Sequence, residues 1–203
     1  NALSVWKLVK ELESAGAAGI FLEDQRWPKR CGHMQGKEVI SQEEYTEKLS
    51  AALDARESKD FIIVARTDAR ATEGLDAAIE RGKQNKKTGA NAVFVEAPRS
   101  LEEMKKIGKE INAPLVANMI EGGATPLSSA ETLNKMGFKI ILYPLSVLYA
   151  STFATMNILK ELKKSGNTTK YKQKVVNFDQ FNDLVELPKF RKMEKKFQKE
   201  NKK

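Results

Sequence analysis

The chain has 203 residues, a formal net charge of +8 at pH 7, one cysteine and one histidine. This length suits one domain with a sizeable core, and no apolar run is long enough to cross a bilayer. A single cysteine excludes an internal disulfide framework. Together with the lack of a signal peptide at the start, it leads us to expect a reducing, cytoplasmic location and no membrane partner.

The positive charge is concentrated at the C-terminus. Residues 189–203 carry eight Lys or Arg and two Glu, a net +6, which leaves +2 for the rest of the chain. Phe190, Met193 and Phe197 recur at helical spacing there, so we expect an amphipathic helix with a solvated basic face. No motif interleaves aromatic and basic residues, so we expect no nucleic-acid partner. A polyanion-binding tail stays open as an alternative.

The chain opens on a helical pattern. Leu3, Trp6, Val9 and Leu12 recur every three residues, and Gly16 follows in the position of a C-cap. Because this helix is already under way at the first residue, and no initiator Met is present, we expect that upstream sequence is missing from the chain.

Five short apolar runs rich in β-branched residues predict buried parallel strands. They lie within residues 13–24, 61–68, 86–97, 113–119 and 134–144. Helical patterns follow the runs, at residues 41–56, 73–88, 100–110, 127–136 and 146–164. Ser41 and Glu44 form a predicted capping box at the start of the first of these helices. The alternation of strands and helices indicates a parallel α/β protein.

Polar residues stand at the carboxyl end of every predicted strand. They are Glu23, Asp24, Arg66, Thr67, Asp68, Glu96, Asn118 and Tyr143. In a parallel α/β barrel this edge carries the active site. One such carboxylate alone is more often a helix cap or a loop hydrogen bond, but polar ends on all five strands indicate a shared pocket. Five units do not close a barrel of eight, so the sheet is open or about three upstream units are absent. The helical start favours the second possibility.

The stretch PKRCGH, residues 28–33, follows the first strand and holds the only cysteine and the only histidine. Lys29 and Arg30 favour the thiolate of Cys31 electrostatically. His33 is close enough in sequence to exchange a proton with Cys31 or with a bound anion. Cys-x-His offers too few ligands for a metal site. Spacing alone leaves a catalytic loop and an exposed surface loop equally open.

The segment EDQRWPKRCGH resembles the signature of the isocitrate lyase and phosphoenolpyruvate mutase superfamily. VARTDA, VFVEAP, ANMIEGGATP and LYPLS extend the resemblance in the family's order, from residue 1 to about residue 190. It implies a (β/α)8 TIM-type barrel, here lacking about three N-terminal βα units, with C-terminal helices swapped between subunits. Residues 1–166 would form the C-terminal part of that barrel. Residues 167–203 would be a helical segment for contacts in a homo-oligomer, a homotetrameric dimer of dimers.

The resemblance also implies a role for each matching residue. Cys31 would be the acid/base that exchanges a proton with the enolate-like carbon during carbon–carbon bond cleavage. Glu23 would contact Mg²⁺ through water, with Mn²⁺ as an alternative ion. The remaining catalytic residues, on the mobile loop, would be Lys29, Arg30 and His33. The substrate-binding residues would be Gly32, Arg66, Glu96, Asn118, Met119 and Ile120.

Two departures from the family pattern bear on activity. The family's principal metal-binding aspartates, and a serine pair that binds substrate, precede the opening helix and are absent from this sequence. We therefore expect negligible turnover from the chain alone. Methylisocitrate lyases also look to carry arginines where this chain has Tyr149 and Phe181. Losing two cations favours a smaller or less charged substrate.

The leading interpretation is a Mg²⁺-dependent lyase. It would cleave a 2-hydroxy di- or tricarboxylate, of the 2-alkylmalate or methylisocitrate type, into a 2-oxo acid (pyruvate or glyoxylate) and a carboxylate. Alternatives within the enzyme class are an oxaloacetate hydrolase or decarboxylase and a carboxyvinyl-carboxyphosphonate phosphonomutase. A non-catalytic barrel homologue is the alternative of another class.

Overall fold

A computed structural model describes residues 1–200 of the chain, with side-chain burial for residues 1–198. The chain divides into two compact units, Asn1–Val147 and Leu148–Lys203. This division lies earlier than the boundary after residue 166 suggested by the sequence, because helix α7, Ser146–Ser165, begins where the first unit ends. Within residues 1–200, no helix combines the length and the apolar character needed to span a membrane.

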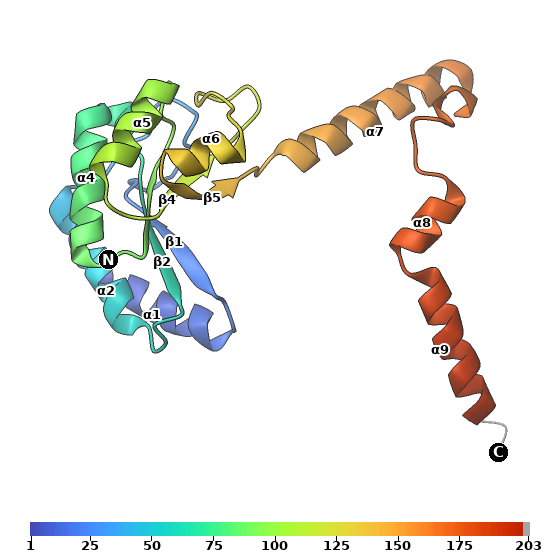
Figure 1. The fold of residues 1–203 in the computed structure, drawn as a ribbon, viewed down its shortest axis with the longest axis horizontal. Helices are drawn as coiled ribbons and strands as arrows, with labels where there is room; N and C mark the ends of the chain where they lie inside the picture. The colour runs from blue at the N-terminus through green and yellow to red at the C-terminus, as the bar shows by residue number, and fades with distance from the viewer. Residues whose placement is uncertain (201–203) are drawn as a thin grey trace. The chain divides into compact units, whose positions relative to one another are not determined.

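The first unit is built on five parallel strands, all at the predicted places (Figure 1). The strands are β1 Gly19–Glu23, β2 Ile62–Thr67, β3 Ala92–Val95, β4 Leu115–Asn118 and β5 Phe138–Leu142. Each strand pairs in parallel with its neighbour in sequence, in the order β1-β2-β3-β4-β5. This order is that of a TIM-type barrel, whereas a doubly wound sheet reverses its order at a switch point. Within the described residues, β1 and β5 are the two edges of the sheet.

Helices precede and connect the strands, and the sequence predicted all of them except the short helix at residues 69–72. They are α1 Ala2–Ser14, α2 Gln42–Ala55, α3 Ala69–Thr72, α4 Leu75–Thr88, α5 Leu101–Glu110 and α6 Ala130–Lys135. Gly16 follows α1 with φ +85°, a left-handed conformation that glycine adopts without steric cost. Ser41 Oγ accepts a hydrogen bond from Glu44 N at 3.2 Å at the start of α2. This is the N-cap half of the predicted capping box.

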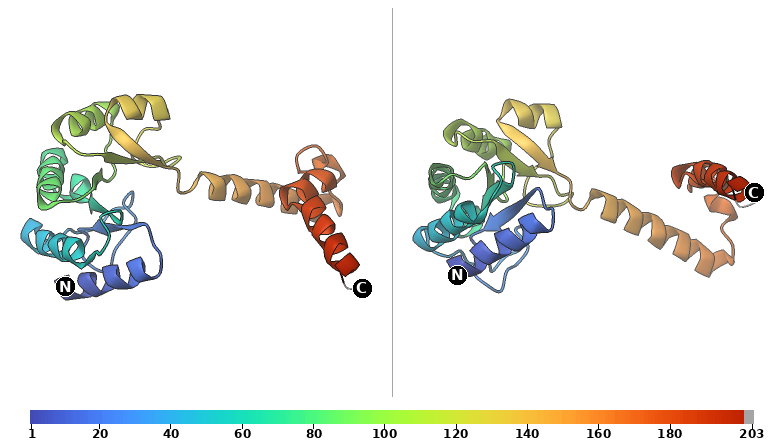
Figure 2. Two further views of the ribbon diagram at one scale, coloured as in Figure 1. Left: turned by 60° about the horizontal axis from the view of Figure 1, so that its bottom comes forward. Right: turned by 90° about the horizontal axis from the view of Figure 1, so that it is seen from below.

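The two faces of the sheet bury different side chains. Helices cover one face (Figure 2), where Ile63 and Ala65 of β2 join the core between sheet and helices. Val64, the residue between them, faces the other way and packs with Phe94 in a smaller apolar cluster on the inner face. Alternation along β2 therefore places Arg66 on the inner face as well, at the carboxyl end of the strand. The curved sheet brings the functional side chains to this edge.

The second unit is helical. It continues α7 and adds η1 Thr169–Tyr171, α8 Phe178–Leu184 and α9 Leu187–Glu200. Helix α9 confirms the amphipathic helix predicted for the basic tail, and residues 201–203 of that tail lie outside the described residues. The unit exposes several large apolar side chains, among them Phe153, Phe178, Phe181 and Phe190.

Replacing Ile107 by alanine tests the core between sheet and helices. Ile107 on α5 is fully buried in the cluster that includes Val93 and Leu133. Ile107→Ala should lower the free energy of unfolding by about 2–5 kcal/mol, because it removes buried methyl groups and leaves a cavity. Leu3 is 63% exposed on α1, so Leu3→Ala should change that energy by no more than about 0.5 kcal/mol. Urea unfolding of both variants measures the difference, and equal losses would contradict this core.

Candidate active site at the carboxyl ends of the strands

A cleft of about 470 Å³ opens at the carboxyl ends of the strands. It collects nearly all the residues predicted for the site. Its lining comprises Glu23, Lys29, Arg30, Cys31, Gly32, His33, Arg66, Glu96, Asn118, Ile120, Pro144 and Leu145. Pro144 and Leu145 belong to the LYPLS motif but received no role from the sequence.

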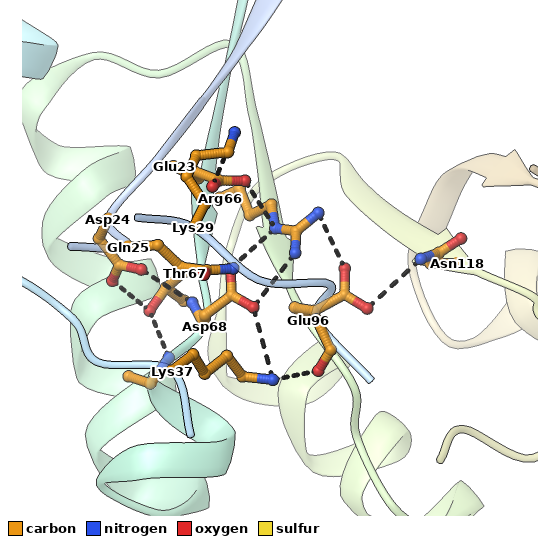
Figure 3. A network of polar contacts seen from close by, with 12 residues as sticks. Glu23, Asp24, Gln25, Lys29, Lys37, Arg66, Thr67, Asp68, Glu96 and Asn118 are labelled. Carbon is orange, nitrogen blue, oxygen red and sulfur yellow. Dashed lines mark hydrogen bonds and ion pairs between the residues drawn. The ribbon is translucent and has the colours of Figure 1, made fainter. Parts of the chain in front are cut away.

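Arg66 lies at the centre of a charged network (Figure 3). Its Nε and Nη2 donate to the Asp68 carboxylate at 2.9 and 3.1 Å. Its Nη1 lies 3.3 Å from Glu96 Oε2, and its Nε lies 3.6 Å from Glu23 Oε2. The guanidinium also stacks over Phe94, 5.1 Å from the ring centroid. Burial alone would lower the pKa of Arg66, but the hydrogen bonds to Asp68 and the nearby carboxylates raise it above its usual value.

Glu96 is almost fully buried and links the strand ends to the loop. His33 Nε2 lies 2.9 Å from its Oε1, and Asn118 Nδ2 donates to the same oxygen at 3.3 Å. Burial by itself would raise the pKa of Glu96, but the contact with His33 and the charge of Arg66 outweigh burial and lower it. Glu96 is therefore held as a carboxylate.

The loop between β1 and α2 has a fixed neck. Ile40 N donates to Asp24 O at 2.8 Å, and Arg26 N donates to Glu38 O at 2.9 Å. Gln25 then pairs its side-chain amide with the backbone of Arg30, donating from Nε2 and accepting at Oε1, both at 2.9 Å. The tip that carries Cys31 thus projects from a closed base. A loop with a fixed base can move its tip over a substrate without disturbing the sheet.

Asp24 anchors this neck from beneath. It is fully buried and accepts from Thr67 Oγ1 at 2.6 Å, from Asp68 N at 2.9 Å and from Arg81 Nη1 at 3.2 Å. Arg81 also donates to Ile40 O at 3.0 Å, so one guanidinium holds both ends of the loop. Burial raises the pKa of Asp24, and its hydrogen bonds and Arg81 only partly offset that rise. Asp24 stabilises the base of the loop and does not line the cleft.

Two glycines allow the loop tip to reach the strand ends. A Cβ added to Gly32 would lie 2.4 Å from Glu96 Cγ and 2.7 Å from Arg66 Nη2. A Cβ on Gly123 would lie 2.8 Å from His33 Nδ1. Neither position has room for a side chain, so both glycines permit a close approach of backbone to the site.

His33 joins the loop tip to the segment after β4. Its Nδ1 accepts a hydrogen bond from Ala124 N at 2.9 Å, so the ring proton lies on Nε2, toward Glu96. Nε2 lies 2.9 Å from Glu96 Oε1 without a well-aligned hydrogen bond, so only Nδ1 is hydrogen-bonded in this conformation. The exchange of a proton with Cys31, which the sequence suggested, therefore requires His33 to leave these partners.

Some expected residues lie elsewhere. Met119, expected to bind substrate, is fully buried in the core between sheet and helices and does not line the cleft. Alternation along β4 is the reason, because Asn118 faces the inner side and the next residue faces the opposite way. Tyr143 is 51% exposed and is likewise absent from the cleft lining. Lys37, to which the sequence analysis gave no role, is buried beneath the loop tip.

The described residues fit a magnesium ion only through one carboxylate. Glu23 Oε1 is buried and accepts no well-aligned hydrogen bond, although Lys29 Nζ lies 2.9 Å away. A carboxylate oxygen of this kind suits a water ligand of Mg²⁺. No group of three or more His, Cys, Asp or Glu within the described part of the chain is arranged to hold a metal. These residues therefore offer a contact to the ion and not its full coordination shell.

Acid unfolding tests the charge of Glu96. Its pKa lies below the usual 4.5 in the folded state, so it stabilises the fold above that pH, and this contribution is lost as pH falls through the folded pKa. Glu96→Gln should reduce the free energy of unfolding at neutral pH. Below pH 4.5, the free energy of unfolding of this variant should fall less steeply with decreasing pH than that of the wild type. Urea unfolding across this range, with the exposed Glu131→Gln as control, measures both. An unchanged acid dependence in Glu96→Gln would contradict the network.

Comparisons with known proteins identify relatives of the chain. The chain is 50% identical over 200 residues to a carboxyvinyl-carboxyphosphonate phosphorylmutase, chloroplastic, of Arabidopsis thaliana, covering 97% of this chain and 59% of that protein. It is 45% identical over 194 residues to a 2,3-dimethylmalate lyase of Eubacterium barkeri, covering 96% and 67%. The chain thus spans about three fifths of the length of the first of these relatives.

Solved structures share the fold. The chain superposes on a phosphoenolpyruvate phosphomutase from Streptomyces platensis subsp. rosaceus with a TM-score of 0.85 and 29% identity, covering 97% of this chain and 69% of that one. A phosphonopyruvate hydrolase in complex with oxalate and Mg²⁺ gives a TM-score of 0.77 and 25% identity, covering 96% and 68%. The sequence model of the phosphoenolpyruvate phosphomutase family matches residues 1–163. The chain therefore belongs to the phosphoenolpyruvate phosphomutase family, within the phosphoenolpyruvate mutase/isocitrate lyase superfamily.

Proposed function

We propose that this chain carries the substrate cleft of a Mg²⁺-dependent carbon–carbon lyase. The proposed substrate is a 2-hydroxy di- or tricarboxylate, of the 2-alkylmalate or methylisocitrate type, and the products are a 2-oxo acid (pyruvate or glyoxylate) and a carboxylate. One observation supports this most strongly. Cys31, on a loop with a fixed neck, lines the same cleft as Arg66 and Glu23.

The residues of the cleft suit the steps of such a cleavage. The 2-hydroxyl gives its proton to water or to a base of the complete protein, and the C2–C3 bond breaks as the carbonyl forms. The electron pair left on C3 takes a proton from the Cys31 thiol, and the thiolate then regains a proton from solvent. Arg66, together with Lys29 and Arg30 on the loop, supplies positive charge for substrate carboxylates. When bound, Mg²⁺ would stabilise negative charge on the oxygens of the oxo acid, with Glu23 in contact through water. Closure of the loop excludes water while the carbon is negatively charged.

The relatives support the reaction class and narrow the substrate. One is named a 2,3-dimethylmalate lyase, and a solved relative binds oxalate with Mg²⁺. Tyr149 and Phe181 stand where methylisocitrate lyases look to carry arginines. Fewer cations suit a substrate with fewer carboxylates, so a 2-alkylmalate is favoured over a tricarboxylate.

The names of two relatives support two alternative activities, a phosphorylmutase and an oxaloacetate hydrolase. The relative at 50% identity is named a carboxyvinyl-carboxyphosphonate phosphorylmutase, and an oxaloacetate acetylhydrolase superposes with a TM-score of 0.81 and 30% identity. Both names describe chemistry on small anionic substrates, and the cations Lys29, Arg30 and Arg66 of the cleft also suit such substrates. The assay below separates them from the lyase.

Turnover by the complete gene product tests the proposal. With Mg²⁺ and a panel of 2,3-dimethylmalate, other 2-alkylmalates, 2-methylisocitrate, isocitrate, oxaloacetate and phosphonopyruvate, we expect 2-oxo acid release from 2-alkylmalates. Cys31→Ala should lower that rate about 10²- to 10⁴-fold, since it removes the proton donor, and a chelator should abolish it. A coupled dehydrogenase measures release, with the exposed Ser58→Ala as control.

The other results of this panel reassign or reject the activity. Turnover of oxaloacetate or a phosphonate alone would move the assignment to a hydrolase or a mutase. Silence across the panel from a folded protein would contradict the lyase and favour a non-catalytic homologue. Residues 1–203 alone should show negligible turnover, and full activity from them would contradict the need for further metal ligands.

We also propose that the second unit mediates self-association into a dimer of dimers. Its exposed apolar side chains include Phe153 at 72% and Phe178 at 81% exposure, more than water-facing helices usually carry. Light scattering of the complete gene product should give a tetramer. Phe153→Glu together with Phe178→Glu should shift it to smaller species, while Lys163→Glu, on the same helix as Phe153, should not. A wild-type monomer at working concentration would contradict the proposal.

A further inference from the structure

Lys37 is a buried lysine directly beneath the loop tip. Its side chain is 2% exposed. Its Nζ donates to the carbonyl oxygens of Gly32 and Met34, the latter at 3.2 Å, and lies 3.9 Å from Asp68 Oδ1. Figure 3 shows Lys37 extended under the network, with Nζ reaching toward Asp68.

This arrangement depends on the loop conformation. Burying an amino group away from water is unfavourable unless hydrogen bonds and a nearby charge replace its hydration. Two of the three oxygens around Nζ belong to the loop tip, at Gly32 and Met34 on either side of His33. If the tip lifted away, Lys37 would keep only Asp68. The buried lysine therefore favours the conformation in which the tip lies against the strand ends.

Lys37 is connected to the substrate side of the site through Asp68. The Asp68 carboxylate accepts two hydrogen bonds from Arg66, and the backbone N–H of Asp68 donates to Asp24. Asp68 itself is fully buried and cannot turn toward solvent. One carboxylate thus contacts both the group beneath the loop tip and the guanidinium that faces the cleft.

Lys37 does not face the cleft itself. It lines a neighbouring hollow of about 510 Å³, together with residues such as Ala71, Thr72 and Arg99, and this hollow shares Gly32 and His33 with the cleft. Cys31 and Arg66 line the cleft and not this hollow. The amine therefore lies outside the lining of the cleft that Cys31 and Arg66 share.

We infer that Lys37 is a positioning residue, which couples the closed position of the Cys31 loop to the buried carboxylate of Asp68. Its Nζ fixes the turn from Gly32 to Met34, so that Cys31 and His33 are held at the mouth of the cleft. Its meaning for catalysis rests on the proposed lyase function, whereas the effect on the loop does not.

Limited proteolysis tests the effect on the loop without any need for activity. Trypsin cleavage after Arg30 in the folded complete gene product requires the tip to open. Lys37→Met keeps the length and apolar stem but removes the donors, so this cleavage should accelerate about tenfold. Lys59→Met, at an exposed lysine after α2, should leave the rate unchanged. An unchanged rate in Lys37→Met would overturn the inference, whatever the activity of the enzyme.

Steady-state kinetics tests the effect on catalysis. Lys37→Met should lower kcat about 100-fold through misplacement of Cys31, with a much smaller change in KM because Asp68 still holds Arg66. Equal changes in kcat and KM, or none, would overturn the coupling. If the wild-type protein has no turnover, the proposed function fails while proteolysis still decides the role of Lys37.

Two further measurements guard against a folding defect. Thermal unfolding should show that Lys37→Met remains folded at the assay temperature. If it does not, Lys37→Gln takes its place, since a shorter amide keeps one donor but cannot reach all three oxygens. Its cleavage rate should fall between those of Lys37→Met, where measurable, and the wild type. A rate equal to the wild type would again overturn the inference.

Discussion

The site depends on the pairing of one partly buried guanidinium with the carboxylates around it. Arg66 contacts Asp68, Glu96 and Glu23, from three different strand ends, within 3.6 Å. Charges withdrawn from water are stable only when they are paired and hydrogen-bonded, so each contact fixes the side chain that makes it. The contact with Glu23 is the longest of the three. Glu23 is therefore the carboxylate that Arg66 holds least tightly.

The loop between β1 and α2 also depends on paired charges. Asp24 and Arg81 pair beneath its neck, and Lys37 lies near Asp68 beneath its tip. The base of the loop is thus attached to the sheet, while the tip depends on a few contacts made by Lys37 and His33. On the proposed function, this division would let the loop close in one defined position and still open for exchange of substrate and product.

The sequence predicted the strands and the position of the site well, because both follow from local patterns. Apolar β-branched runs identify buried parallel strands, and polar residues at their ends identify the functional edge. The face on which a residue lies follows from period-two alternation, which places the Met119 side chain in the core and not in the cleft. Asn118 points into the cleft, so its neighbour cannot.

Other features depend on tertiary contacts that no local pattern reveals. A lysine in a polar, glycine-containing loop is ordinarily exposed, so the sequence around Lys37 does not predict that its side chain is buried. Arg81 stands on a helical face that reads as solvated, yet it spans from Glu73 to Asp24 and Ile40. The sequence also does not predict the division of the chain after Val147, because helix α7 continues across it without a break.

The most direct test of the central claim follows the proton that Cys31 is proposed to deliver. The complete gene product would cleave 2,3-dimethylmalate in D₂O with Mg²⁺, and NMR would record the propionate formed beside pyruvate. The account predicts one deuterium at C2 of propionate, with formation of this product greatly slowed in Cys31→Ala. Propionate formed at an unchanged rate in Cys31→Ala, or the absence of any cleavage by a folded wild-type protein, would contradict the account.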